Sequence, residues 1–340
     1  MGNKLNMDNN FSTKYRPQTF SEVVGQEIPK TVLKKIAMSP GIACRSIFLK
    51  GSWGSGKTTM ARIFARSMNC SEFHKTGEVC NTCPACQEAK AQNSQLYMEF
   101  DATTAGNVDS IRALHDKLSY LPPKGMRRVV VFDEVHACTT AALNALLKLV
   151  EEGIPQTIFV FCSTEDILPT LRSRSICLDI TTIPPVLMSE RIKEIASIEG
   201  ISISANDINT ICTKSKGHMR DAISILQLYS LAGHEVLKTP TELIYKYILS
   251  CLKKDRATAL TYIPEIMSYP TTDITSSIAG LIQGIYISDE TSPYYQLLKS
   301  GVVNKLFNFF YTPVNQQAFK SEVGTELVLR SFLEKTNPNV

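Results

Sequence analysis

The sequence lacks the features of a membrane or secreted protein. No apolar run approaches the ~18 residues needed to cross a bilayer, and Met1–Asn6 lack the apolar stretch of a signal peptide. No internal repeat or low-complexity block is present, and a hydrophobic content of 44% excludes wholesale disorder. At roughly 150 residues per domain, the 340 residues predict two or three soluble domains, and we expect them in the cytoplasm.

A large excess of one charge is also absent. The 36 basic and 32 acidic side chains give a net charge of +4, too small by itself to indicate nucleic-acid binding. The ten cysteines are not expected to form disulfides in a cytoplasmic chain. Six of them lie among apolar residues and are predicted to be buried free thiols: Cys44, Cys138, Cys162, Cys177, Cys212 and Cys251.

Between residues 45 and 180, short apolar runs alternate with helical patterns. The runs are at 47–49, 96–100, 129–132, 158–161 and 176–180. Apolar residues at helical spacing separate them, among them Met60, Ile63, Phe64 and Met68. This alternation predicts an α/β fold, in which a parallel sheet is covered by helices on both faces.

Proline-containing breaks divide the rest of the chain. One break at Ile183–Pro185 and another at Thr239–Pro240 separate regions with helical patterns. The expected organisation is a flexible tail (1–10), an α/β domain (11–182), a small helical domain (183–237) and a C-terminal helical domain (238–340). Two apolar stripes in the last region predict core-facing helices: Ile244, Tyr247, Ile248 and Cys251, and then Val303, Leu306, Phe307 and Phe310.

Gly51–Thr58 matches the pattern of a P-loop, the phosphate-binding turn of many nucleotide hydrolases. An apolar run precedes it and an amphipathic helical pattern follows, as phosphate binding requires. The glycines allow backbone N–H groups to face phosphate, Lys57 is expected to reach the β and γ phosphates, and Thr58 is expected to ligate magnesium. The alternative is a chance glycine-rich turn.

The run Val129–Phe132 ends in two carboxylates. We expect Asp133 to hold magnesium, and Glu134 to polarise the attacking water as a general base. The alternative is a strand that ends at a solvated acidic turn. The P-loop earlier in the chain favours the catalytic interpretation.

Cys70, Cys80, Cys83 and Cys86 supply four thiolates within a short segment, enough to close a tetrahedral zinc shell. His74 lies in the long gap and is an alternative ligand to Cys70. Free thiols, a redox pair and a nucleic-acid-reading zinc ribbon are further alternatives. The nearby acidic residues Glu72, Glu78 and Glu88 argue against a phosphate-facing ribbon.

Several segments together resemble the bacterial clamp-loader gamma/tau family of AAA+ ATPases. The P-loop and the four-cysteine insert about 70–88 are two of them. The others are Thr13–Phe20, Val23–Gln26, Asp133–His136, Asn144–Lys148 with Glu151–Glu152, Leu168–Pro169, Ser173–Ser175, Gly217–Ala222 and Glu322–Leu327. The resemblance implies an AAA+ P-loop domain with a zinc insert, a helical lid domain (183–237) and a helical collar domain that joins subunits (238–340).

The resemblance also implies roles for individual residues. It places Ser163–Thr164 at the first sensor of the γ-phosphate, with Thr164 as the catalytic candidate, and Arg220 at the second sensor. Arg174 matches the arginine finger that enters the ATP site of the neighbouring subunit; a surface ion pair is the alternative for either arginine. The expected nucleotide-binding residues are Tyr15, Arg16, Pro17, Val23, Val24, Gly51, Trp53, Gly54, Ser55, Gly56, Lys57, Thr58, Thr59, Met219 and Arg220.

The sequence departs from the family pattern at three places. Ser175 replaces a cysteine after Arg174, and the stretch from Ser163 to Ser173 is shorter than usual. Ala105 stands where the family often has a DNA-binding arginine, which leaves Arg112 as the DNA-contact candidate. The long tail of the tau form is absent, which predicts a short gamma-like form from a bacterium or a bacterial virus.

The resemblance implies a motor subunit of a clamp loader that uses ATP, Mg²⁺ and Zn²⁺. It would open the sliding clamp and load it onto primer–template DNA, within a pentameric ring that also serves the replicative DNA polymerase. Two alternatives remain. A nucleotide-independent structural subunit of the delta-prime type would have lost P-loop residues, and a DNA-translocating AAA+ motor would have no reason for the four-cysteine insert.

Overall fold

The computed structural model describes residues 10–39, 44–91, 94–237, 240–286 and 302–336. The chain divides into two compact units, Met1–Leu237 and Lys238–Val340. The predicted tail lies outside the described residues except for Asn10, whose side chain caps helix α1 (Phe11–Lys14) by accepting a hydrogen bond from Ser12 N. None of the described helices combines the length and the apolar character that a bilayer span requires.

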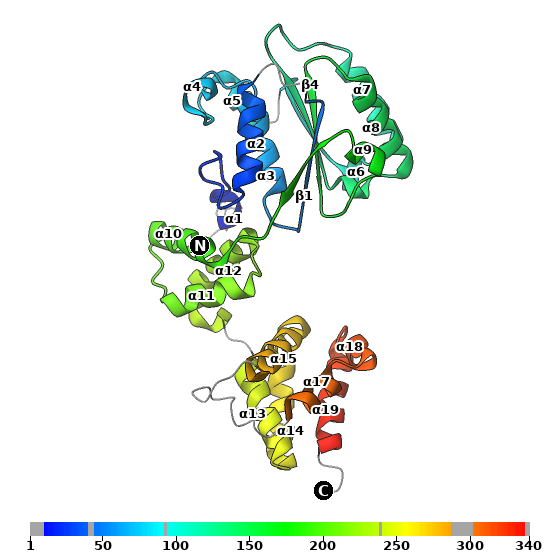
Figure 1. Cartoon of the computed structure of the whole chain (residues 1–340). Helices are drawn as coiled ribbons and strands as arrows, with labels where there is room; N and C mark the ends of the chain where they lie inside the picture. Colours follow the sequence, from blue (N-terminus) through cyan, green and yellow to red (C-terminus); the bar gives the residue numbers. More distant parts are fainter. Residues whose placement is uncertain (1–9, 40–43, 92–93, 238–239, 287–301, 337–340) are drawn as a thin grey trace, which may run out of the picture. The chain divides into compact units, whose positions relative to one another are not determined.

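A five-stranded parallel sheet forms the centre of the first unit (Figure 1). Its strand order is β2-β3-β4-β1-β5, and every neighbouring pair is parallel. The strands are β1 (Ser46–Gly51), β2 (Tyr97–Asp101), β3 (Arg128–Asp133), β4 (Thr157–Ser163) and β5 (Ile176–Ile180). They coincide with the five apolar runs, so the predicted parallel sheet is confirmed.

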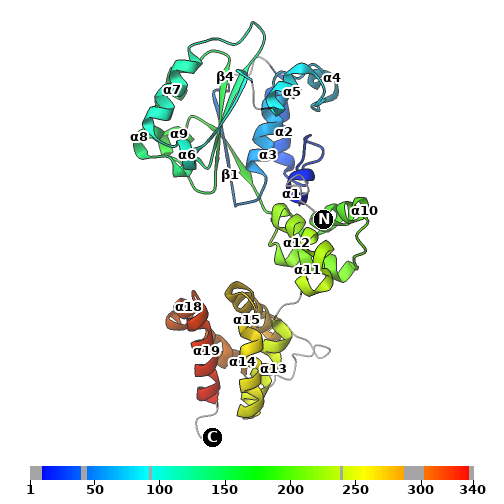
Figure 2. The same cartoon turned by 180° about the vertical axis from the view of Figure 1, so that it is seen from behind.

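Helices lie against both faces of this sheet, as Figure 1 and Figure 2 show from opposite sides. Successive side chains of a strand point to opposite faces, and β3 follows this rule. Val129 and Val131 pack into the core beneath α2 and α3, whereas Val130 and Phe132 pack into the core beneath α7 and α8. The helices of this domain are α2 (Glu27–Met38), α3 (Lys57–Ser67), α4 (Phe73–Thr76), α5 (Pro84–Lys90), α6 (Ala102–Ala105), α7 (Val108–Leu118), η2 (Val135–Ala137), α8 (Thr140–Glu152) and α9 (Pro169–Arg172).

Three helices and a 3-10 turn complete the first unit. They are α10 (Pro185–Ile198), α11 (Ala205–Lys214), α12 (Met219–Ala232) and η3 (Gly233–Leu237). They enclose a separate apolar cluster that includes Ile192, Ile211 and Leu226, all fully buried. Phe11 and Tyr15 of the N-terminal segment pack against this cluster. The segment that leads into the α/β domain is therefore held by the helical lobe.

The described part of the second unit consists of helices only. They are α13 (Thr241–Leu252), α14 (Arg256–Met267), α15 (Thr271–Tyr286), α17 (Val302–Phe310), α18 (Pro313–Ala318) and α19 (Glu322–Thr336). The stripe of Ile244, Tyr247, Ile248 and Cys251 is completely buried, as predicted. Tyr247 also donates a hydrogen bond from its hydroxyl to the carbonyl oxygen of Leu329, which ties α13 to α19.

Two predictions of burial were wrong. Cys177 is exposed because β5 is an edge strand that pairs only with β1. Phe307 is 51% exposed and stacks on Tyr311, since its position on α17 is turned about 100° from the buried Leu306. Leu306 and Phe310 of the same stripe are buried, whereas the side chain of Val303 lies outside the described part of the chain.

Candidate nucleotide-binding and metal sites

The P-loop connects β1 to α3, as its sequence predicts. β1 ends at Gly51 and α3 begins at Lys57. Gly56 has a φ of 104°, and a Cβ on Gly51 would lie 2.3 Å from the carbonyl oxygen of Ile180. Both positions therefore require glycine. The free N–H groups at the start of α3 face the space that the loop encloses, where they favour an anion.

Buried polar atoms line the inside of this loop. Lys57 is only 4% exposed, and its Nζ donates to the carbonyl oxygens of Gly51 and Ser52, each at 3.0 Å. The hydroxyl of Ser55 is buried and has no hydrogen-bond partner among the described residues. Because an unsatisfied buried polar group is costly, these donors fit the phosphate oxygens of a nucleotide.

Thr58 and Asp133 meet at the carboxyl end of the sheet. Thr58, in the first turn of α3, donates from Oγ1 to Oδ2 of Asp133 at 2.7 Å. Asp133 is the last residue of β3. A hydroxyl and a carboxylate are oxygen ligands of the kind that Mg²⁺ prefers beside phosphates. The pair fits the predicted magnesium site.

Glu134 has an unusual backbone conformation and an unsatisfied side chain. Its φ of 50° lies in the left-handed region, which residues other than glycine rarely adopt. Its Oε2 is buried without a hydrogen bond and lies 3.4 Å from Nδ1 of His136. His136 Nδ1 is also 3.2 Å from the Ser163 hydroxyl. A carboxylate oxygen without a donor can accept a proton from a water molecule, as a general base must.

Two adjoining cavities surround the P-loop. The first has phosphate-site character and is lined by Trp53, Gly54, Gly56, Lys57, Thr58, Thr59, Asp101, Thr103, Asp133, Glu134 and Arg220. The second is more apolar and suits a base: Tyr15, Arg16, Pro17, Val23, Val24, Ser55 and Met219 are among its lining residues. Gly54, Gly56, Thr59 and Arg220 line both. The structure thus brings almost all the predicted nucleotide-binding residues to one continuous site.

The helical lobe reaches this site through two residues of α12 and its N-cap. The Arg220 guanidinium lies 5.7 Å from the ring centre of Trp53, which is 59% exposed. His218 Nε2 and the Ser52 hydroxyl are 2.9 Å apart. These contacts link the lobe to the P-loop itself, so a ligand that moves the loop also acts on the lobe.

The two first-sensor candidates, Ser163 and Thr164, have different surroundings in the structure. Ser163 is completely buried at the end of β4, contacts His136 and accepts a hydrogen bond from Glu165 N. Thr164 is half-buried and lines neither nucleotide cavity. Ser163 therefore has the more direct connection to Glu134.

Arg174 lies at the other end of the sheet from the P-loop. Its carbonyl oxygen accepts from the hydroxyl of Ser46, the first residue of β1, whereas the P-loop follows Gly51 at the end of that strand. Five strand residues span about 16 Å, more than twice the roughly 7 Å reach of an extended arginine side chain. The half-exposed guanidinium pairs with Glu151 at 2.8 Å. Arg174 thus has no route to the phosphate site of its own chain.

Arg112, the DNA-contact candidate, projects from α7. Its guanidinium is 3.1 Å from the Asp109 carboxylate, and both side chains are well exposed. An exposed pair of this kind contributes little to stability, so the guanidinium is available to an outside partner. Ala105 ends α6 on the same side of the sheet (Figure 1).

Sequence analysis missed four residues around the nucleotide site. Asp101 and Thr103 line the phosphate-side cavity. His136 contacts Glu134, and His218 contacts Ser52. Asp101 could have been found, because it ends β2 and lies directly opposite Asp133 in the sheet register. Residues at the carboxyl ends of neighbouring parallel strands share one edge. The histidine contacts depend on tertiary structure and carry no such signal.

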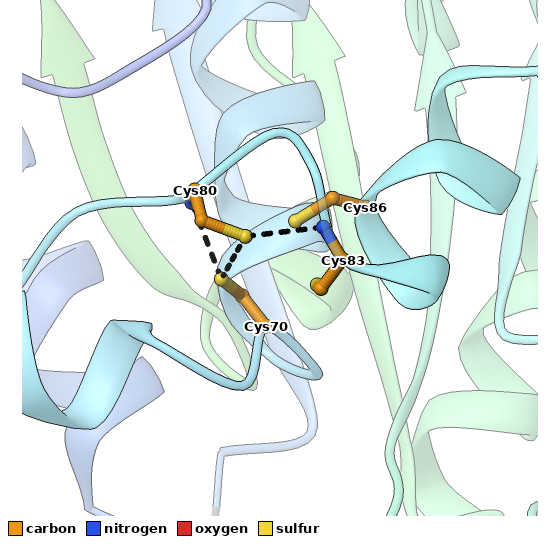
Figure 3. Close-up of side chains that lie close together, drawn as sticks. All are labelled: Cys70, Cys80, Cys83 and Cys86. Atoms are coloured by element: carbon orange, nitrogen blue, oxygen red, sulfur yellow. Dashed lines mark hydrogen bonds between the residues drawn. The ribbon is translucent and has the colours of Figure 1, made fainter.

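The four clustered cysteines converge on one point (Figure 3). Their sulfur atoms all lie within 4.8 Å of one another. A tetrahedral zinc site with Zn–S bonds of about 2.3 Å needs sulfur atoms roughly 3.8 Å apart, so the geometry fits zinc. The N–H of Cys80 donates to Cys70 Sγ, and the N–H of Cys83 donates to Cys80 Sγ, each at 3.3 Å. The alternative ligand His74 is exposed and outside the cluster.

Local hydrogen bonds favour the thiolate form that a metal needs. The backbone N–H of Thr82 lowers the pKa of Cys80 to about 6, whereas burial raises the pKa of Cys86. The insert is anchored by Phe73 and Val79, which pack into the core beneath α2 and α3. All ten cysteines are free thiols, so no disulfide competes for the cluster. These features suit a closed structural metal site.

Comparison with known proteins gives consistent results. Residues 25–184 match the family described as "DNA polymerase III, delta subunit". The chain is 38% identical over 217 residues to DNA polymerase III subunit gamma/tau of Mycobacterium tuberculosis, which covers 63% of this chain and 37% of that protein. It is 31% identical over 283 residues to DNA polymerase III subunit gamma of Buchnera aphidicola, which covers 81% of this chain and 72% of that protein. The match thus spans less than half of the longer relative.

Solved structures resemble the fold at lower identity. The Thermotoga maritima RuvB Holliday junction branch migration motor aligns with a TM-score of 0.50 and 23% identity, over 67% of this chain and 73% of that one. This likeness supports the α/β fold and says nothing about a substrate. The Buchnera match extends across most of both chains, and therefore the chain belongs to the DNA polymerase III gamma/tau family.

Proposed function

We propose that this chain is an ATP-driven motor subunit of a clamp loader, which opens a sliding clamp and loads it onto primer–template DNA. One observation supports the proposal: in a chain of the gamma/tau family, four residues suited to ATP hydrolysis, Lys57, Thr58, Asp133 and Glu134, line one cavity. Lys57 lies inside the P-loop, Thr58 contacts Asp133, and Glu134 has an unsatisfied carboxylate oxygen beside the same cavity.

The proposed hydrolysis uses these residues in distinct roles. Lys57 Nζ would exchange its two carbonyl partners for β- and γ-phosphate oxygens. Thr58 and Asp133 would hold the Mg²⁺ that neutralises phosphate charge. Glu134 would orient a water molecule and take its proton, and Ser163 and His136 would fix the carboxylate. The buried position of Lys57 keeps its charge directed at the phosphates.

The helical lobe would act as a lid that reports the nucleotide state. His218 contacts Ser52 of the P-loop, and Arg220 lines both cavities. ATP, which is longer and more negative than ADP, would draw the Arg220 guanidinium toward the γ-phosphate. Loss of that phosphate would release the lid, and the movement would be transmitted to neighbouring subunits.

Several further properties come with this function. Arg174 would complete the ATP site of the adjacent subunit in a pentameric ring, and residues 238–340 would form the collar that joins subunits. The ring would act with the sliding clamp and the replicative DNA polymerase in the cytoplasm. DNA would be held mainly through its phosphates, with Arg112 as a candidate contact, so binding should be insensitive to sequence and sensitive to salt.

An ATPase assay with primed DNA and clamp tests the proposal. The reconstituted ring should hydrolyse ATP slowly alone and faster when both are added. Lys57→Ala in this chain should abolish the stimulation, because the charge that meets the phosphates is lost. Lys75→Ala is a matched control, since Lys75 is exposed and pairs with Glu72 of its own helical turn. ATP turnover that is unaffected by Lys57→Ala would contradict the proposal.

The same assay separates the alternatives. A structural subunit of the delta-prime type would contribute no hydrolysis, so Lys57→Ala would change nothing. The family description that names the delta subunit makes this a specific rival. A DNA-translocating motor would be stimulated by DNA without the clamp. Such a motor usually carries a C-terminal winged-helix domain that binds DNA. The described residues of the second unit contain only helices, which gives no support to such a domain.

A further inference from the structure

A second polar cavity lies beside the nucleotide site, on the side of the zinc insert. It measures about 410 Å³, compared with roughly 30 Å³ for one water molecule. Its walls come from the end of α1 and the segment after it, from α3, from α5 and from β2. Five basic side chains line it, Lys14, Arg16, Arg62, Arg66 and Lys90, and no acidic side chain does.

Only two of these five cations have a carboxylate partner. Lys14 pairs with Glu199 at 2.6 Å, and Arg62 makes a two-pronged pair with Glu99, at 2.6 and 2.8 Å. Among the described residues, no carboxylate lies within ion-pairing distance of the other three: Arg16, Arg66 and Lys90. The cavity therefore carries a local excess of about three positive charges, which no side chain in its wall neutralises.

Arg66 gives a second, independent indication of a ligand. It is only 7% exposed, and its Nη1 and Nη2 donate to the side-chain and backbone oxygens of Gln18. Its Nε is buried without any hydrogen-bond partner. Burial lowers the pKa of Arg66, which is the cost of a guanidinium held away from water without a counter-charge. A negatively charged ligand in the adjoining cavity would supply the missing counter-charge, although the Nε itself is too deeply buried to contact it.

We propose that this cavity binds a small phosphate anion, inorganic phosphate or pyrophosphate, at a site separate from the P-loop. Three uncompensated cations match an anion of two to three negative charges. Guanidinium groups suit phosphate because their planar forks meet its oxygens in pairs. Arg66 is too deeply buried for the backbone of a DNA duplex to reach, so the cavity favours a small free anion. This inference does not depend on the proposed ATPase function.

The site would be coupled to nucleotide binding. Arg16, Pro17 and Thr59 line both this cavity and the base-binding cavity. Burial, and then the charges of Arg62 and Arg220, lower the pKa of Arg16, and Glu99 and Asp133 offset this lowering only in part. An anion would relieve that repulsion. By linkage, any effect of the anion on nucleotide affinity must equal the effect of nucleotide on anion affinity.

Calorimetric titration of the full chain with pyrophosphate tests the proposal. The P-loop also binds phosphates, so the Lys57→Ala chain is the background in which a second site is visible. We expect that background to bind one pyrophosphate. Adding Lys90→Gln or Arg66→Gln should weaken binding about tenfold or more, because each removes a charge-assisted contact. Lys90 is exposed, so its variant tests the site without risk to the core. Lys75 is an exposed lysine of the insert outside the cavity, so Lys75→Gln should leave pyrophosphate affinity unchanged.

Three results would overturn the proposal. The Lys57→Ala chain would bind no pyrophosphate if the P-loop were the only anion site. Binding that both Lys90→Gln and Arg66→Gln leave unchanged would place the anion elsewhere. Displacement of pyrophosphate by an oligonucleotide at equal phosphate concentration would show a nucleic-acid site in place of a small-anion site. None of these results depends on whether the ring hydrolyses ATP.

Discussion

The nucleotide cavities and the Arg174 segment form an instructive contrast within one domain. The first gathers residues from α3, β3 and the helical lobe around buried, unsatisfied polar atoms. The second lies at the opposite end of β1, where Arg174 is half-exposed and forms an ion pair with Glu151 of its own chain. Under the proposed function, the first region would bind ATP by itself. The other offers a cation that its own site cannot use, so full activity should require an adjacent copy or sister subunit.

The largest effect should follow from Arg174→Ala. An arginine supplied from outside typically contributes about 10³–10⁵ in rate, so the clamp- and DNA-stimulated hydrolysis should fall by that order. The ATP affinity of each chain should stay nearly unchanged. Steady-state hydrolysis together with nucleotide titration measures both quantities. Arg172→Ala is a matched control, because Arg172 ends α9 two residues before Arg174 and pairs with Asp166. A rate that falls equally in both variants would indicate local unfolding instead.

Glu134→Gln should have the next largest effect. The change keeps the shape of the side chain and removes its basicity, so turnover should fall by about 10²–10⁴ while ATP still binds. The trapped ATP-bound ring should hold the clamp for longer than the unaltered ring. Single-turnover hydrolysis and clamp retention check this. Normal turnover in the variant would mean that another carboxylate of the same cavity, such as Asp101, is the base.

His136→Gln should have a smaller effect on turnover. His136 touches both Glu134 and Ser163, so its loss should misplace the base by a fraction of an ångström to an ångström. Such misplacement costs roughly ten- to a hundredfold in rate, with little change in ATP affinity. Ser163→Ala should resemble it. Full activity in both variants would show that the contacts of His136 with Glu134 and Ser163 do not position the base.

Zinc removal should have the smallest effect on the ATP site. The cysteine cluster follows the C-terminal end of α3, whereas the P-loop precedes its start. The 11 residues of the helix separate the two by about 16 Å. We expect one zinc per chain by elemental analysis, loss of that zinc with Cys86→Ser, and ATP affinity changed no more than about twofold. Cys177→Ser, at an exposed thiol outside the cluster, should retain the metal. Metal-free protein purified without chelator would contradict the zinc site.

Much of the fold could be predicted from the sequence because its three central strands, β1, β3 and β4, are buried on both faces. Such strands are continuous apolar runs, and all five strands of the sheet were found within two residues of their ends. Cys177 and Phe307 were placed wrongly because local apolar context does not reveal an edge strand or the rotation of a single helix position. Burial at such positions is decided by neighbours far away in the sequence.

The candidate site likewise has parts that the sequence predicts and parts that it does not. The P-loop and the cysteine cluster were predictable because a short stretch of chain supplies most of the ligands. The contact of His136 with Ser163, and that of His218 with Ser52, join segments 27 and 166 residues apart. The basic cavity is harder still to predict, since its five cations come from three separate segments: residues 14–16, α3 and α5. Sequence spacing carries little information about such assemblies.

The central claim is that Arg174 serves the ATP site of a neighbouring chain, and a mixing experiment tests it most directly. Rings are assembled from Arg174→Ala and Lys57→Ala chains together, and their composition is confirmed by native mass spectrometry. Such rings contain interfaces that join an intact P-loop to an intact Arg174. The account predicts that mixed rings regain stimulated ATP hydrolysis that neither variant shows alone. Hydrolysis that stays absent in rings confirmed to be mixed would contradict it.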